Sequence, residues 1–274
     1  MPDQRTNLSV GIIGGGILGS AAKQYYKNAL VFDTNPDRCF NSLEEVMAQD
    51  FVFICVPTPM TGETGEIDLS IVKGVFEKLR PGPIYILKST VVPGTTISLQ
   101  NTYTDLTVVY SPEFLTEKYA AEDFAFPDKN IVGYTETPES QRAAVEVAKI
   151  LPQAHTMICQ ATEAETIKYA LNSYYAIKVI FANQLYDLCE ALDINYNAVH
   201  RGLAADKRVN DSHFRILHGD HRGFGGNCLP KDTSAITRRA DELKVDLSLI
   251  RAAIKANEEY KKIKFTEDAD EKET

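Results

Sequence analysis

The chain has 274 residues, of which 44% are hydrophobic, and it carries a formal net charge of −9 at pH 7. This length and apolar content suffice for one large or two modest domains with buried cores. The acidic balance argues against a nucleic-acid-binding protein, which usually has a basic face. No stretch reaches the roughly 20 apolar residues that span a membrane. Five widely spaced cysteines without a CxxC pair favour reduced thiols in a cytoplasmic protein.

The first half of the chain alternates short apolar runs with helical or loop segments. The runs are rich in β-branched and aromatic residues and lack polar alternation, which is typical of parallel strands buried on both faces. They lie at residues 8–14, 29–33, 50–56, 83–89, 107–111 and 130–134, with helical patterns at 42–49 and 68–79. This order predicts a Rossmann-type, doubly wound α/β domain with a mostly parallel sheet over residues 1–160.

After residue 160 the pattern predicts helices and no further strands. Apolar residues recur every three or four positions from Glu163 to Leu192, which predicts one helix about 45 Å long. Such a helix is a candidate domain spine or dimer interface. Further helices are expected from about Asn197, after Pro230 and over 247–263, so residues 161–263 form a predicted all-helical domain. The acidic tail, residues 264–274, is predicted to be disordered.

A glycine-rich segment follows the first predicted strand directly. Gly14-x-Gly16-x-x-Gly19 permits a tight turn, close approach of a pyrophosphate and close packing of the next helix, whose N-terminus favours an anion. Asp33 ends the second strand, where a carboxylate binds the ribose hydroxyls of NAD and repels the extra phosphate of NADP, although Arg38 weakens that exclusion. A turn without a ligand is the alternative interpretation. The predicted cofactor-binding residues of this segment are Gly14, Gly16, Ile17, Leu18, Gly19, Asp33 and Arg38.

A second glycine-rich segment, GFGGNCLPKD at residues 223–232, surrounds a single cysteine. Pro230 suits the first turn of a helix, so Cys228 is expected just before a helix N-terminus, where a thiol pKa falls and the thiolate is favoured. Lys231 adds to this effect, and the glycines allow a ligand to approach the backbone. The physical pattern leaves two interpretations open, a nucleophilic cysteine and a glycine-rich turn that contains a small apolar residue.

Six motifs in the same order resemble the UDP-glucose/GDP-mannose dehydrogenase family. They are the cysteine motif GFGGNCLPKD, FICVPTPMTGETGEIDLS (53–70), LKSTVVPGTT (87–96), YSPEFLTE (110–117), EAETIKYALNSYYA (163–176) and DKRVN (206–210). The similarity runs from about residue 8 to about residue 262. We identify the chain from these motifs as a member of the family, in a short form that lacks the family's C-terminal nucleotide-binding domain.

The resemblance implies a four-electron oxidation of a nucleotide-sugar primary alcohol to a carboxylate, with two molecules of NAD. Cys228 then forms a thiohemiacetal and a thioester with the substrate. Glu113 activates the water that hydrolyses the thioester, and Lys168 and Asn172, four residues apart on the long helix, stabilise the alkoxide and the oxyanion. Asp232 holds the catalytic water and helps to deprotonate the alcohol. Without the resemblance, each of these residues has a non-catalytic interpretation. Glu113 is then a surface glutamate, Lys168 and Asn172 lie on a solvated helix face, and Asp232 supplies a favourable charge at a helix N-terminus.

The resemblance also implies the remaining contacts. Thr58 and Thr90 line the dinucleotide and nicotinamide site, with Val56, Pro57 and Lys231 as further cofactor contacts and Thr90 also catalytic. Arg208 binds the sugar, in some family members in the neighbouring subunit. The predicted substrate-binding residues are Phe114, Leu115, Lys168, Asn172, Arg208, Phe224, Gly225 and Cys228. His213, His218 and His221 suggest a metal by residue type alone, but the family reaction uses none, and no metal is expected.

The expected function is NAD-dependent oxidation of UDP-glucose to UDP-glucuronate by a cytoplasmic homodimer that associates through the 163–192 helix. Pro-Glu-Phe at 112–114 resembles the UDP-glucose and GDP-mannose members rather than the N-acetylmannosamine branch. Three alternatives stay open: GDP-mannose or another UDP-sugar as the substrate, a split enzyme completed by a partner chain, and a non-catalytic module that binds NAD.

Overall fold

The computed structural model describes residues 8–62 and 65–263, so the predicted tail at 264–274 lies outside it. The chain divides into two compact units. Unit 1 comprises Met1–Thr61 and Ile67–Lys168, and unit 2 comprises Gly62–Glu66 and Tyr169–Thr274. The division falls within a helix at Lys168, and the predicted functional domains, residues 1–160 and 161–263, stay a prediction.

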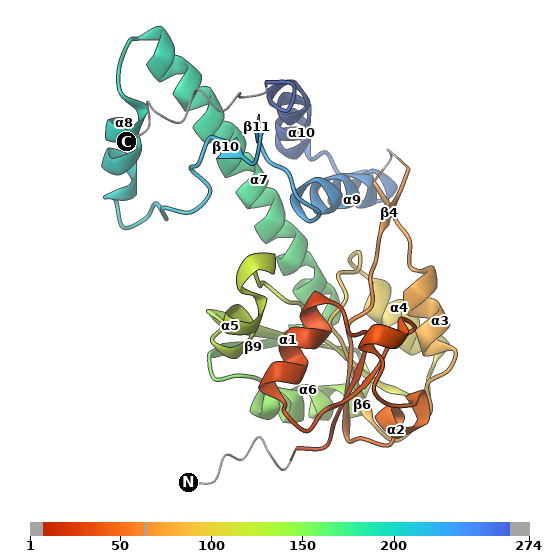
Figure 1. The fold of residues 1–274 in the computed structure, drawn as a ribbon. Coiled ribbons are helices and arrows are strands. Elements are labelled where there is room, and N and C mark those ends of the chain that lie inside the picture. Colours follow the sequence, from red (N-terminus) through yellow and green to blue (C-terminus); the bar gives the residue numbers. More distant parts are fainter. Residues whose placement is uncertain (1–7, 63–64, 264–274) are drawn as a thin grey trace. The chain divides into compact units, whose positions relative to one another are not determined.

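The described part of unit 1 is built on a seven-stranded sheet of order β2-β1-β3-β6-β7-β8-β9 (Figure 1). Every neighbouring pair is parallel except β7 with β8, which confirms the predicted doubly wound, mostly parallel sheet. The strands are β1 (Val10–Ile13), β2 (Leu30–Phe32), β3 (Phe51–Ile54), β6 (Ile84–Leu87), β7 (Thr107–Tyr110), β8 (Lys129–Tyr134) and β9 (His155–Gln160).

Helices cover both faces of this sheet (Figure 1). They are α1 (Ile17–Tyr25), α2 (Leu43–Met47), α3 (Ser70–Phe76), α4 (Thr95–Thr102), α5 (Ala120–Ala125) and α6 (Pro138–Ile150), with 3-10 turns η2 (Pro36–Arg38) and η3 (Glu117–Tyr119). Alternate strand residues point into two different cores: Phe53 packs with α1, α5 and α6 residues, whereas Val52 and Ile54 pack with α2, α3 and α4 residues. Burial on both faces explains why these strands read as unbroken apolar runs.

Local sequence signals begin several of the helices. Ser42 and Glu45 form a reciprocal capping box at α2, and Thr137 caps α6 with Pro138 in its first turn. The helices α4, α5 and α6 and the strand β9 are additions that the sequence patterns did not predict. Strand β9 lies at the edge of the sheet with Cys159 as its one buried residue, so it lacks the buried apolar run that marked the other strands.

The described part of unit 2 is mainly helical. Its spine is the continuation of α7 (Ala161–Ala191), which agrees closely with the helix predicted over 163–192. It is followed by α8 (Tyr196–Ala204), α9 (Leu229–Glu242) and α10 (Ser248–Tyr260). The prediction that strands stop after residue 160 is wrong in detail, because β10 (Leu217–His218) and β11 (His221–Arg222) pair as a short antiparallel ribbon. A second ribbon is formed by β4 (Met60–Thr61) and β5 (Glu66–Ile67).

Two small apolar clusters hold unit 2 together. Ala176, Val179 and Ile180 of α7 pack with Phe224 and with Ala253 of α10. Further along α7, Ala182 and Cys189 pack with Tyr196, Phe214 and Ile216. No helix in the described part of the chain is both long and apolar enough to cross a bilayer.

Candidate functional site

The glycine-rich turn between β1 and α1 is shaped by its neighbours. Gly14 has φ +101°, a conformation that L side chains rarely adopt. A Cβ at Gly19 would lie 1.8 Å from the Gly14 carbonyl oxygen, so only glycine lets α1 pack this closely on the turn. By contrast, no described atom outside the adjoining backbone and side chains lies within 4 Å of a Cβ built on Gly16, and Ile17 is exposed. No described side chain caps α1, so no side-chain acceptor occupies its first N–H groups, which is the arrangement that an anion such as pyrophosphate needs.

Asp33 lies against this turn, as the dinucleotide interpretation requires. Its Oδ2 accepts a 2.6 Å hydrogen bond from the Gly15 N–H, and its Oδ1 accepts one of 2.7 Å from Asn35. The backbone oxygen of Arg38 lies 2.9 Å from a Cβ built on Gly15, so Arg38 borders the same turn with an exposed side chain. The carboxylate is therefore held where a ribose would follow the pyrophosphate. The turn and Asp33 fit one end of NAD.

The other predicted cofactor residues of unit 1 lie beside this turn because of the strand order. Strands β1, β3 and β6 are parallel neighbours, so the segments that follow them leave the same edge of the sheet. Val56, Pro57 and Thr58 follow β3, and the Thr58 hydroxyl donates a 2.7 Å hydrogen bond to the carbonyl oxygen of Thr90 after β6. Strand β1 has β2 on one side and β3 on the other. The carboxyl end of β1 is therefore a topological switch point, where α/β proteins bind ligands.

Glu113 follows β7 at the same edge and is doubly anchored. Its Oε2 lies 3.0 Å from the ammonium nitrogen of Lys88, whose side chain is only 4% exposed. Its backbone oxygen accepts a 2.6 Å hydrogen bond from Lys168 Nζ. The Lys168 ammonium also lies 5.3 Å from the ring centroid of Phe114, whereas Leu115 packs against the core on the α1 side of the sheet. Unit 1 therefore brings Glu113, Lys168 and Phe114 together, and the surface-glutamate interpretation of Glu113 is wrong.

Asn172 and Asp232 form the central polar pair of unit 2. The Asn172 amide donates a 2.5 Å hydrogen bond to Asp232 Oδ2, and Lys231 Nζ lies 2.7 Å from Oδ1. Asp232 is 1% exposed and Asn172 6% exposed, so neither side chain belongs to a solvated surface. A buried carboxylate with a donor on each oxygen is held in one orientation. The solvated-face interpretation is therefore wrong for Asn172.

Cys228 is the N-cap residue of α9, as the sequence predicted, with Pro230 in the first turn. It is the exposed member of the five cysteines, all of which lie in the described residues and are free thiols. Asp232 N–H donates to the Cys228 carbonyl oxygen at 2.8 Å, so the thiol and the buried carboxylate occupy successive turns at the start of α9. This arrangement can present a nucleophile beside an oriented acid-base group.

The loop before Cys228 is held from two sides. Asn257 of α10 accepts from Phe224 N–H at 2.6 Å and donates to Phe224 O at 3.0 Å. Arg222 is 5% exposed, donates to Asn183 of α7 at 2.9 Å and forms a 2.6 Å ion pair with Asp187. Phe224 is thus a buried anchor with its ring in the unit 2 core. Gly225 is half-buried beside His221. For both Phe224 and Gly225, contact with the substrate stays a prediction.

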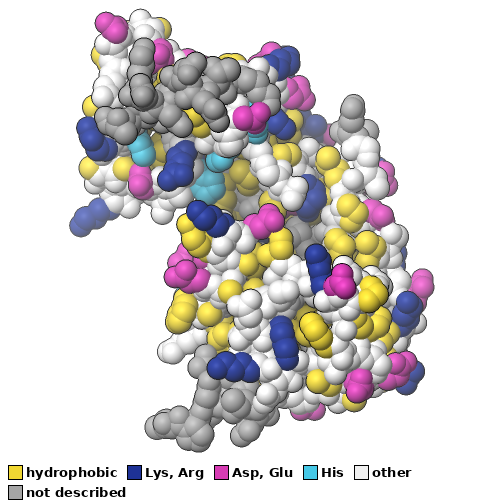
Figure 2. Space-filling view, in the orientation of Figure 1, with side chains coloured by type: hydrophobic (Ala, Val, Ile, Leu, Met, Phe, Trp, Pro, Cys, Tyr) yellow, Lys and Arg dark blue, Asp and Glu magenta, His cyan; other side chains and the backbone are white. Residues whose placement is uncertain are grey.

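Arg208 and the histidines lie in the segment between α8 and α9. Arg208 is exposed and pairs with Asp206 of its own loop, so its sugar contact stays a prediction. His213 stacks on Tyr175 at 4.1 Å, and burial together with nearby Lys178 and His218 lowers the pKa of His213. Histidine side chains visible in Figure 2 have both basic and acidic side chains nearby. In the described residues, no three His, Cys, Asp or Glu side chains gather as a metal-binding group.

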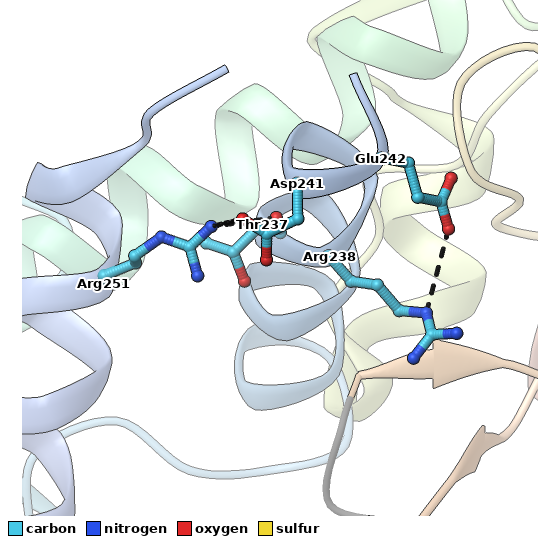
Figure 3. A pocket seen from close by; sticks show the side chains of 5 residues that line it. All are labelled: Thr237, Arg238, Asp241, Glu242 and Arg251. Carbon is cyan, nitrogen blue, oxygen red and sulfur yellow. Dashed lines mark hydrogen bonds and ion pairs between the residues drawn. The ribbon is translucent and has the colours of Figure 1, made fainter. Parts of the chain in front are cut away.

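A polar pocket of about 390 Å³ lies beside α9 and α10 in unit 2, and none of the predicted site residues lines it (Figure 3). It is lined by Thr237, Arg238, Asp241, Glu242 and Arg251. Both arginines pair with acidic side chains: Arg251 lies 2.5 Å from Asp241, and Arg238 Nε lies 3.8 Å from Glu242. Because the charged side chains that line the pocket pair with one another, they indicate no particular ligand.

Two site neighbours, Lys88 and Arg222, were not predicted. Lys88 stands at the end of the apolar run IYILKS, and a lysine inside a buried strand signals a buried partner. The partner, Glu113, is 25 residues further along the chain, so only the pairing of β6 with β7 identifies it. Arg222 precedes the glycine motif and gave no periodic signal.

Comparison with known proteins places these features in context. Residues 18–151 match the NAD binding domain of the UDP-glucose/GDP-mannose dehydrogenase family, and residues 162–259 match the central domain of that family. Together the two matches span most of the chain.

Individual relatives agree with this match. A UDP-glucose 6-dehydrogenase of Rickettsia conorii is 32% identical over 248 residues, covering 86% of this chain and 55% of the relative. One of Pseudomonas aeruginosa is 35% identical over 240 residues, covering 82% and 52%. The structure of a UDP-glucose dehydrogenase from Pyrobaculum islandicum superposes with a TM-score of 0.81 at 26% identity, over 94% of this chain and 70% of that one. The chain spans about half the length of the curated relatives it matches.

Proposed function

The chain belongs to the UDP-glucose/GDP-mannose dehydrogenase family, and on this premise we propose that it oxidises UDP-glucose to UDP-glucuronate with two molecules of NAD. The observation that carries the proposal is the exposed Cys228 thiol at the start of α9, one turn before the buried, oriented Asp232 carboxylate. An alcohol oxidation that stops at the aldehyde makes no use of such a thiol, whereas in oxidation to the acid a thiol that adds to the aldehyde allows a second hydride to leave. UDP-glucose is the substrate named for the relatives in R. conorii and P. aeruginosa.

In this proposal, NAD bound at the Gly14–Gly19 turn supplies the hydride acceptor for both oxidation steps. Asp232 takes the proton from the sugar 6-hydroxyl group as a hydride leaves the carbon that bears this group. The Asn172 amide nitrogen has two N–H groups and donates one of them to Asp232. We assign the other to the substrate oxygen, where together with the Lys168 ammonium it stabilises the alkoxide and later the oxyanion.

The second oxidation passes through the thiol. The sulfur of Cys228 adds to the aldehyde carbon and gives a thiohemiacetal, and transfer of a second hydride from that carbon to the second NAD⁺, with loss of the hydroxyl proton, gives a thioester. A water molecule activated by Glu113 then attacks the thioester carbon, which releases the carboxylate and returns the thiol. The ion pair of Glu113 with Lys88 keeps this carboxylate in a fixed place before the water arrives. Thr90 lines the nicotinamide end of the site in this assignment, and Arg208 binds the sugar.

The test uses the purified chain with NAD⁺ and a panel of UDP- and GDP-sugars, followed by NADH absorbance. We expect two NADH for each UDP-glucose consumed. NADH with GDP-mannose or another UDP-sugar instead would reassign the substrate, and no NADH with any sugar of the panel would contradict the activity. A dinucleotide-binding assay by fluorescence accompanies the panel, because NAD binding without turnover would identify a binding module.

We further propose that two copies associate through α7. Four large apolar side chains of this helix are exposed at spacings of seven and four residues, which lines them along one face: Tyr174 57%, Phe181 51%, Leu188 53% and Leu192 58%. A second copy offers the same face, as a symmetric dimer requires. Light scattering should give the mass of a dimer for the wild type and of a monomer for Phe181→Asp. Leu249→Asp, at an exposed leucine of α10, is the matched control and should leave the mass unchanged.

We also propose a cytoplasmic location, supported by the five free thiols. Recovery in the cytosolic fraction of fractionated cells is the expected result. Recovery with the membranes or outside the cell would contradict it.

A further inference from the structure

Glu165, in the first turns of α7, is a buried carboxylate to which the reaction scheme assigns no role. It is 0% exposed. Its Oε1 accepts hydrogen bonds from Thr96 N–H at 2.7 Å and Thr96 Oγ1 at 2.6 Å, and its Oε2 accepts one from Gly94 N–H at 2.6 Å. Three donors on one carboxylate fix both the glutamate and the segment that supplies the donors.

The segment held by Glu165 carries two groups of the site. Gly94 is the N-cap residue of α4 and has φ +99°, so it joins α4 to the residues that follow β6. Those residues include Lys88, which pairs with Glu113, and Thr90, whose carbonyl oxygen is bonded by Thr58. Fixing Gly94 therefore limits how far the chain from Lys88 to Thr90 can move.

The same helix carries Lys168, one turn after Glu165. Lys168 Nζ donates to the backbone oxygen of Glu113 at 2.6 Å, and Glu113 Oε2 contacts Lys88 at 3.0 Å. These contacts close a ring within unit 1: α7 to the β7 loop through Lys168, the β7 loop to β6 through Lys88, and the β6–α4 segment back to α7 through Glu165. Removing the Glu165 contact opens the ring and leaves Lys88 linked to Lys168 through Glu113 alone.

We propose that Glu165 is a positioning residue for the oxidation, which fixes Lys88 and Thr90 relative to Lys168. The inference rests on the proposed function for its consequence in catalysis, and on the hydrogen bonds and the ion pair of unit 1 for its geometry. A carboxylate is required because two acceptor oxygens serve three donors. The amide of glutamine replaces one oxygen with an N–H donor, which would face either Gly94 N–H or the Thr96 donors.

The experiment compares wild-type protein, Glu165→Gln and the control Glu163→Gln. Glu163 lies two residues earlier on α7, is exposed, and accepts a 2.8 Å hydrogen bond from Gln160 N–H in its own helix turn. Both variants thus remove one negative charge and disturb one carboxylate cap, but only Glu165 contacts the β6–α4 segment. The measurements are kcat and KM with UDP-glucose and NAD⁺, and the rate at which acetic anhydride labels Lys88, read by mass spectrometry.

We expect Glu165→Gln to lower kcat about 10- to 100-fold while both KM values change little, because a displacement of about 1 Å has effects of this size. Lys88 should be labelled faster than in the wild type, and Glu163→Gln should match the wild type in both measurements. Unchanged kcat per folded molecule, with only a lower melting temperature, would reduce Glu165 to a structural role and overturn the inference.

Two further outcomes keep the test decisive. If the wild type forms no NADH, the proposed function fails by itself, and unchanged Lys88 labelling in Glu165→Gln would overturn the positioning inference independently. If Glu165→Gln does not fold, Thr96→Val removes one of the three donors with a side chain of similar shape. We expect a smaller decrease of kcat and a smaller increase of labelling there, and the absence of both would contradict the inference.

Discussion

The two glycine-rich turns of this protein, Gly14–Gly19 in unit 1 and Gly223–Gly226 in unit 2, look alike in sequence and are built differently. Each leads into a helix that no described side chain caps. In the first turn, glycines are required by the backbone itself, because Gly19 packs on Gly14, while the space at Gly16 stays open. In the second, side chains from α7 and α10 brace the turn, and the helix starts with an exposed cysteine.

This difference separates two uses of one local signal. An open helix N-terminus behind bare glycines suits an anionic ligand, which needs backbone donors and no side chains in the way. A braced turn suits a reactive side chain, which must stand in one place while the substrate is converted. Glycine before a helix start therefore does not identify the chemistry, and the residues that contact the turn do.

Replacing Cys228 with alanine should give the largest effect, because it removes the group that distinguishes the second turn. We expect acid formation from UDP-glucose to fall by about 10³-fold or more, as for loss of other catalytic nucleophiles. NAD⁺ binding should stay unchanged. The measurements are NADH release and NAD⁺ titration by fluorescence, with the half-buried Cys39→Ala as the control. Acid formation by Cys228→Ala near the wild-type rate would show that both turns only bind.

Alanine at Gly19 and at Gly16 tests whether the first turn has one packed and one open position. Gly19→Ala places a Cβ 1.8 Å from a backbone oxygen, and we expect a loss of about 3 kcal/mol in unfolding free energy. Gly16 has φ −68°, which alanine adopts, so Gly16→Ala should unfold like the wild type and raise the Kd for NAD⁺ about 10-fold. Urea unfolding and NAD⁺ titration separate the two effects, and similar behaviour of both variants would contradict the assignment.

The corresponding pair in the second turn is Gly223 and Gly226. Both have positive φ, but a Cβ at Gly223 would lie 2.4 Å from Asn257 Oδ1, whereas no described atom lies within 4 Å of one at Gly226. We expect Gly223→Ala to lower the unfolding free energy by about 2–3 kcal/mol, through backbone strain plus loss of the Asn257 contact, and Gly226→Ala by about 1 kcal/mol. Equal losses in urea unfolding would mean that Asn257 does not brace the turn.

Titration of Tyr260 should give the smallest effect and should concern only the braced turn. Burial, reinforced by Asp187, raises the pKa of Tyr260 to about 12, and its ring lies 4.7 Å from the Arg222 guanidinium. Because the folded state keeps this proton longer than the unfolded state, whose tyrosine pKa is about 10, the contribution is present below about pH 10 and is lost as the pH rises toward 12. Tyr260→Phe should therefore flatten the decrease of unfolding free energy above pH 10. An unchanged slope would contradict the assignment.

Much of unit 1 could be predicted because its signals are local. Apolar runs such as 50–56 predicted the central strands, and the glycine spacing predicted the turn beside Asp33. Strand β9 was missed because most of its residues are exposed at the sheet edge, and the β10–β11 ribbon because strands of two residues carry no period. Elements that depend on long-range pairing leave little trace in a short window of sequence.

The residues of the candidate site also differ in whether local sequence alone predicts them. Cys228 at a helix start followed from Pro230 and the glycines alone. The resemblance to a family singled out Glu113, Lys168, Asn172 and Asp232, which without it were ordinary polar residues. Their partners are far away in the chain: Lys88 for Glu113, and Asp232 for Asn172, 60 residues apart. Spacing along one helix or strand cannot reveal such pairs.

The sequence by itself determined the doubly wound sheet, the long helix and the two glycine-rich helix starts, since these follow from periodicity and from the conformations open to glycine and proline. Only the tertiary structure decided which polar groups are buried and what each one contacts. It made Glu165 a buried carboxylate with three donors rather than one more charge on a helix, and it braced Cys228's loop with Arg222 and Asn257. The physical reason is that burial and hydrogen-bond partners depend on segments brought together by strand order and helix packing, which no single stretch of sequence contains.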